Sequence, residues 1–140
     1  DTYGQALIDR LELLKREQPH RVHLFQSVGQ LKYLSAMKYC KAVVGNSSSG
    51  IIEAPSFHVP TVNIGDRQKG RMASDTVIHC REEQQDIEAA LDKATSTAFL
   101  SDINNYENPY GDGNSCQKIV DLLKHHLPKS VIKSFYDIKR

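Results

Sequence analysis

The chain has 140 residues, of which 39% are hydrophobic, and its 18 Lys and Arg residues nearly balance 17 Asp and Glu residues to leave a net charge of +1. This length suits about one domain with a real core, and the near-neutral charge argues against a nucleic-acid-binding domain. No apolar run reaches the roughly 18 residues of a membrane span, so we expect a soluble protein without a membrane partner. The three cysteines lie far apart without metal-ligand spacing, so we expect no metal site and a cytoplasmic location.

Hydrophobic spacing predicts the elements of the first part of the chain. Leucines at helical spacing predict a helix over 5–17, and a second helical pattern covers 31–40. Between the two helices, alternating apolar residues predict a short strand over 21–26. The apolar run at 42–44 precedes a glycine and predicts a buried strand.

The same reasoning extends to the end of the chain. A brief helix is expected over 51–57, where Pro55 limits its length, and β-branched runs predict strands over 61–64 and 76–78. A later helix is expected over 87–94. Another is expected to be capped by Asn114 or Ser115 and to end at Leu127. A last amphipathic piece contains Val131, Phe135 and Ile138.

About four short strands that alternate with helices predict an α/β fold, a doubly wound parallel sheet with both faces covered. Because the chain opens in a helix, we expect the first strands of this sheet to precede Asp1. Ligands of such sheets bind at the carboxyl ends of the strands. The loops that follow the predicted strands are therefore the places to look for a site.

The segment 45–50, Gly-Asn-Ser-Ser-Ser-Gly, which we call the serine loop, lies between a predicted strand and a helix start. Free N–H groups, hydroxyls and the helix dipole favour an anion here, and a phosphate suits several converging donors. Neither this loop nor the next has the Lys and Ser or Thr of a nucleoside-triphosphate-binding P-loop. The alternative is a flexible serine loop with an ordinary capping serine. The candidate ligand-binding residues are Asn46, Ser47, Ser48, Ser49, Gly50 and, for vicinal hydroxyls of a ribose or sugar, Glu53.

The segment 65–71, Gly-Asp-Arg-Gln-Lys-Gly-Arg, follows the next strand and is called the basic loop. In a doubly wound sheet it lies beside the serine loop. Arg67 or Arg71 can then bind a pyrophosphate with the two-pronged guanidinium. The alternative is a solvated basic turn. Two anion-favouring loops side by side suggest a pyrophosphate-sized ligand.

Two stretches resemble the UDP-N-acetylglucosamine 2-epimerase family: the serine loop with the segment 51–57 that follows it, and the basic loop with the segment 60–64 that precedes it. The turn Asn-Pro-Tyr-Gly-Asp-Gly-Asn at 108–114 resembles the same family. The Ser-Ser-Ser-Gly and Asp-Arg-Gln-Lys-Gly-Arg strings are similar to its hydrolysing branch, which releases N-acetylmannosamine or a related sugar plus UDP. The resemblance runs from about Asp1 to Leu127.

The resemblance implies a two-domain glycosyltransferase-B-type architecture, with residues 1–140 as a partial carboxyl-terminal, nucleotide-binding Rossmann-like domain. It implies that Ser47 and Ser48 hold the diphosphate, that Glu53 binds the ribose and that Arg67 acts at the leaving group. The loop that contains Gln30 would approach the uracil.

The implied enzyme eliminates UDP and then hydrates the glycal, a reaction of sialic acid biosynthesis that needs no cofactor. Its catalytic carboxylates come from an amino-terminal domain of the same enzyme, so this chain alone would be inactive. The full-length parent would be a homo-oligomer. Two alternatives remain: the nucleotide domain of a B-type glycosyltransferase, or a non-catalytic nucleotide-sugar-binding module.

Overall fold

The computed structural model describes residues 4–127 and 132. The chain divides into two compact units, Asp1–Tyr39 and Cys40–Arg140. The predicted last amphipathic piece, with Val131, Phe135 and Ile138, lies outside the described residues. None of the described helices is long and apolar enough to cross a membrane.

The first unit contains two helices, α1 (Gly4–Glu17) and α2 (Gly29–Tyr39), as predicted. The strand predicted over 21–26 is wrong, because this stretch pairs with no other strand and forms an irregular connection. Val22 and Leu24 are half-buried while His23 and Phe25 are exposed, so the alternation in burial is present without a ladder. Alternating side chains indicate an extended backbone, but a strand also needs a hydrogen-bonded neighbour.

The second unit is built on a parallel sheet of three strands, β1 (Val43–Gly45), β2 (Thr61–Ile64) and β3 (Val77–Cys80), in the order β1-β2-β3. About four strands were expected, and the fourth was the stretch over 21–26 discussed above. The register pairs Val43 with Thr61 and Val62 with Ile78. All strands therefore end at the same edge of the sheet.

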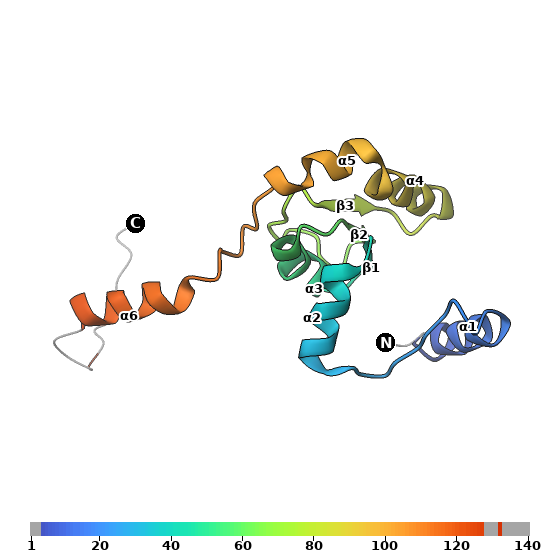
Figure 1. Cartoon of the computed structure of the whole chain (residues 1–140), viewed down its shortest axis with the longest axis horizontal. Helices are drawn as coiled ribbons and strands as arrows, with labels where there is room; N and C mark the ends of the chain where they lie inside the picture. The colour runs from blue at the N-terminus through green and yellow to red at the C-terminus, as the bar shows by residue number, and fades with distance from the viewer. Residues whose placement is uncertain (1–3, 128–131, 133–140) are drawn as a thin grey trace, which may run out of the picture. The chain divides into compact units, whose positions relative to one another are not determined.

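Helices cover both faces of this sheet, which confirms the α/β class (Figure 1). On one face, α4 (Gln84–Thr95) buries Ala90 and Ala94 against Val62 and Ile78. On the other face, α3 (Ser49–Ile52) lies against Thr61, the neighbour of Val62 on β2. Since successive strand residues point to opposite faces, β2 is buried on both sides.

The connections contain shorter helices. Pro55 lies at the start of the 3₁₀ helix η1 (Ala54–Phe57), so the brief helix predicted over 51–57 is divided into α3 and η1. Two further elements were not predicted, α5 (Thr97–Asp102) and the 3₁₀ helix η2 (Ile103–Asn105). Helix α6 (Ser115–His125) begins after Asn114 as expected, but the Asn114 side chain makes no capping hydrogen bond.

Candidate functional site

The carboxyl ends of β1 and β2 bring the serine loop and the basic loop to the same edge of the sheet. Gly45 at the end of β1 pairs with Asn63, one residue before the end of β2. The serine loop leads from β1 into α3, and the basic loop leaves β2 at Gly65, whose φ of +74° favours glycine.

The serine loop presents hydrogen-bond donors that no neighbouring group uses. Ser48 stands at the N-cap of α3, yet its side chain makes no capping hydrogen bond. The Ser47 hydroxyl oxygen accepts the Ser49 N–H at 3.4 Å. Within the described part of the chain, the N–H groups of Ser47 and Ser48 have no acceptor. The loop can thus offer backbone and hydroxyl donors to an anion.

Gly50 seats the serine loop on the sheet. The Thr61 hydroxyl donates to the Gly50 carbonyl oxygen at 2.8 Å. A Cβ at Gly50 would lie 2.6 Å from Cγ2 of Thr61, which leaves no space for a side chain. Position 50 therefore needs glycine because α3 approaches β2 closely.

The basic loop is joined to the serine loop through Asn46. Arg67 Nη1 donates to Asn46 Oδ1 at 3.3 Å, and Gln68 Nε2 donates to the Asn46 backbone oxygen at 2.8 Å. Gln68 is only 4% exposed, so it anchors the loop from inside while Arg67 stays at the surface. The predicted proximity of the two loops is confirmed.

Glu53 lies at the junction of α3 and η1, so it is not inside a longer helix as the sequence suggested. It is half-buried, and its backbone N–H donates to the Ser49 oxygen at 2.9 Å. Its carboxylate makes no hydrogen bond or ion pair with any described residue, which leaves both oxygens available to a ligand.

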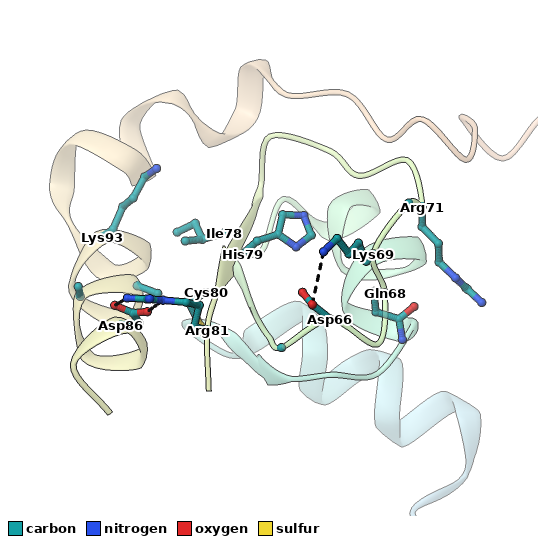
Figure 2. Close-up of a pocket in the computed structure, with 14 residues that line it drawn as sticks. Asp66, Gln68, Lys69, Arg71, Ile78, His79, Cys80, Arg81, Asp86 and Lys93 are labelled. Atoms are coloured by element: carbon teal, nitrogen blue, oxygen red, sulfur yellow. Dashed lines mark hydrogen bonds and ion pairs between the residues drawn. The ribbon is translucent and has the colours of Figure 1, made fainter. Parts of the chain in front are cut away.

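The other two predicted residues are not joined to this group. Arg71 is exposed at the end of the basic loop, and Figure 2 shows its side chain turned outward. Gln30 belongs to the first unit, at the start of α2, where it lines a hollow with residues of the preceding connection. Roles for Arg71 and Gln30 stay predictions.

A hollow of about 740 Å³ lies between the basic loop, β3 and the side of α4 (Figure 2). No serine-loop residue lines it. Two of its cations are paired: Lys69 Nζ lies 3.5 Å from Asp66 Oδ2, and the Arg81 guanidinium donates to Asp86 and lowers the pKa of that carboxyl. The other two cations of the lining, Arg71 and Lys93, have no carboxylate partner among the described residues.

The Cys80 thiol lines the same hollow. Burial raises the pKa of this thiol. Among residues 4–127 and 132, no three His, Cys, Asp or Glu side chains gather into a group that could hold a metal ion.

Sequence reasoning missed the residues that support the loops from within. Asn63 on β2 is 1% exposed and donates to the Gly65 oxygen at 3.5 Å and toward His79 Nδ1 at 3.0 Å. The sequence placed Gln68 in the basic loop but predicted no role for it. A polar residue inside a buried strand, as Asn63 is, was the available signal, because buried amides need partners.

Comparison with known proteins identifies the family of this chain. A family model described as UDP-N-acetylglucosamine 2-epimerase matches residues 1–124. The chain is 42% identical over 99 residues to the GDP/UDP-N,N'-diacetylbacillosamine 2-epimerase (hydrolyzing) of Campylobacter jejuni, covering 71% of this chain and 25% of that protein. It is 38% identical over 114 residues to polysialic acid biosynthesis protein P7 of Escherichia coli, covering 80% of this chain and 29% of that protein.

The fold is also found among solved structures. A crystal structure from Listeria monocytogenes, described as a UDP-N-acetylglucosamine 2-epimerase, superposes with a TM-score of 0.66 at 20% identity. The match covers 85% of this chain and 33% of that structure. This chain spans between a quarter and a third of the length of these proteins.

Proposed function

This chain belongs to the UDP-N-acetylglucosamine 2-epimerase family, and from that membership we propose that it is the nucleotide-sugar-binding part of a hydrolysing epimerase. The observation that carries the proposal is the pair of hydrogen bonds from Arg67 and Gln68 to Asn46, which unite the serine loop and the basic loop. Together the loops offer neutral donors and a guanidinium on one edge of the sheet. Such a set suits the diphosphate of a UDP-sugar.

Each residue has a role in this proposal. Ser47 and Ser48 donate to the diphosphate oxygens, and Glu53 accepts from the ribose hydroxyls with its unpaired carboxylate. Arg67 lies on the side of the leaving group. Asn46, in turn, holds Arg67 toward the serine loop, which limits the reorganisation needed when the ligand binds.

The proposed reaction starts with loss of the C2 proton to a base. The C2–H electron pair forms the C1=C2 double bond of a glycal as the anomeric C–O bond breaks, and the electrons of the C–O bond leave with UDP. Water then adds across the double bond with inverted configuration at C2. Negative charge grows on the diphosphate as the bond breaks, so fixed donors and Arg67 stabilise the transition state. The acid and base that move protons at C2 lie outside these residues, on an amino-terminal domain of the complete protein.

The names of the relatives support the finer assignments of the proposal. We take UDP-N-acetylglucosamine or a closely related acetylated UDP-sugar as substrate, since the Campylobacter relative is named for a diacetylated sugar and the Escherichia coli relative for polysialic acid biosynthesis. We further propose that the complete enzyme is a homo-oligomer and that it acts in sialic acid biosynthesis. Cys40, Cys80 and Cys116, all within the described part of the chain, form no disulfide, which suits a reducing cytoplasm.

Thermal unfolding of the complete protein with and without UDP tests the proposal. A ligand that binds only the folded state raises the free energy of unfolding by about 2.7 kcal/mol at a hundredfold excess over the Kd, and so raises the melting temperature. Superimposed melting curves at millimolar UDP would contradict it.

Glu53→Ala tests the site itself. If Glu53 binds the ribose, UDP affinity falls by about 1–3 kcal/mol in a calorimetric titration of the folded variant. If Glu53 only ends a helix, stability changes by about 0.3–1 kcal/mol and UDP affinity is kept. Glu83→Ala, an exposed carboxylate at the start of α4, is the matched control and should leave UDP binding unchanged.

A further inference from the structure

The turn 108–114, between η2 and α6, reaches back to the segments that follow the serine loop and the basic loop. Asn108 Nδ2 donates to the Ile52 backbone oxygen at 2.9 Å and to Ser56 Oγ at 2.7 Å. The Tyr110 hydroxyl donates to the Met72 backbone oxygen at 3.0 Å. Ile52 directly precedes Glu53, and Met72 directly follows the basic loop. Two side chains of one turn therefore hold the segments next to both parts of the site.

The contact at Ile52 has a specific physical reason. In the 3₁₀ pattern of η1, the residue three positions after Ile52 would donate to its carbonyl oxygen, and that residue is Pro55, which has no N–H. The next N–H, that of Ser56, donates to the Glu53 oxygen instead, at 3.1 Å. Asn108 supplies the missing donor from 56 residues further along the chain.

The turn is well suited to hold these two donors apart at a fixed distance. Asn108 Oδ1 accepts the Tyr110 N–H at 3.0 Å, and the Asn108 backbone oxygen accepts the Gly111 N–H at 3.1 Å. Gly111 has a φ of +120°, which favours glycine. Asn108 is thus a donor to the site-bearing segment and an acceptor within its own turn.

We propose that Asn108 and Tyr110 are positioning residues, which together fix the Glu53 carboxylate and the basic loop in the arrangement that binds UDP. This inference rests on the proposed function of the site. Neither side chain is assigned a contact with the ligand. Their effect is preorganisation: without the turn, binding would have to order both segments first.

The test uses Tyr110→Phe and Asn108→Ala in the complete protein, with UDP as the probe. Tyr110→Phe removes one oxygen from a side chain that is 40% exposed, so the variant should fold. Tyr106→Phe is the matched control, because Tyr106 packs against Phe99 and its hydroxyl has no partner among the described residues. Dissociation constants are measured by calorimetry and melting temperatures on the same samples.

We expect Tyr110→Phe to weaken UDP binding about three- to tenfold and Tyr106→Phe to leave it unchanged. Asn108→Ala should weaken it at least as much, and the double variant should weaken it by less than the product of the single effects, because both act through one turn. In turnover assays, KM for the UDP-sugar rises while kcat stays within about twofold, as expected for uniform binding.

Unchanged UDP affinity in Tyr110→Phe, with or without a lower melting temperature, would overturn the inference and leave only a structural tether. An equal loss of affinity in Tyr106→Phe would overturn it as well. Failure of the wild-type protein to bind UDP would instead overturn the proposed function, and the inference with it. The two failures are therefore distinguished by the wild-type titration.

Discussion

The serine loop and the basic loop follow neighbouring strands, yet they are built differently. The serine loop is fixed by close packing, since Gly50 meets Thr61 with no space for a Cβ. The basic loop is mostly exposed, and the side chains of Arg67 and buried Gln68 anchor it to Asn46 by hydrogen bonds. One loop is positioned mainly by close packing and the other by side-chain hydrogen bonds, so the two should respond differently to substitution.

The largest effect is expected where packing fixes the serine loop. Gly50→Ala places a Cβ 2.6 Å from Cγ2 of Thr61 and should lower the free energy of unfolding by about 1–3 kcal/mol. Chemical denaturation measures this loss. Gly50→Ala combined with Thr61→Ser removes the clashing methyl group but keeps the hydroxyl, so it should recover part of the stability.

Gly70→Ala in the basic loop is the control for this prediction. Gly70 has a φ of +82° and open space around its missing Cβ. The substitution should therefore cost about 1 kcal/mol through backbone strain alone, and removing a neighbouring methyl group should not relieve it. Equal responses at Gly50 and Gly70 would remove the distinction between the loops.

A second effect concerns the charge of the basic loop. Arg67→Lys keeps a positive charge but loses the planar fork that can bind a diphosphate and Asn46 together. Turnover of the complete enzyme should fall about tenfold, or ~1.4 kcal/mol, with a smaller change in KM, because charge grows on the leaving group in the transition state. Steady-state kinetics measure this change. Wild-type turnover in Arg67→Lys would show that Arg67 is an ordinary solvated cation without a role at the leaving group.

The smallest effect is expected for Gln68→Met, which removes the anchor at nearly constant volume. Its stability should change by less than about 1 kcal/mol, because the lost hydrogen bond to Asn46 is offset by removal of Gln68 Oε1, a buried oxygen without a partner. UDP affinity should nevertheless fall about threefold as the basic loop loosens. Lys69→Met, which changes an exposed side chain of the same loop, is the control. A larger loss of UDP affinity in Lys69→Met than in Gln68→Met would mean that the charge of the basic loop, and not its position, determines UDP binding.

The sequence by itself determined the parts of this protein that depend on local pattern. Residues 61–64 are β-branched or apolar except Asn63, and they form β2 where predicted. The serine and basic loops were located because glycines, serines and cations after a strand have their own chemistry. The prediction over 21–26 failed because side-chain alternation cannot supply the neighbouring strand that a ladder requires.

The tertiary structure decided what depends on residues distant in the chain. Glycine at position 50 is required by Thr61, which lies 11 residues later, and the Ile52 carbonyl is satisfied by Asn108, which lies 56 residues later. The burial of Gln68 depends in the same way on the return of the chain to Asn46. Local propensity says which groups can donate or accept, but only the packed fold brings a particular donor to a particular acceptor.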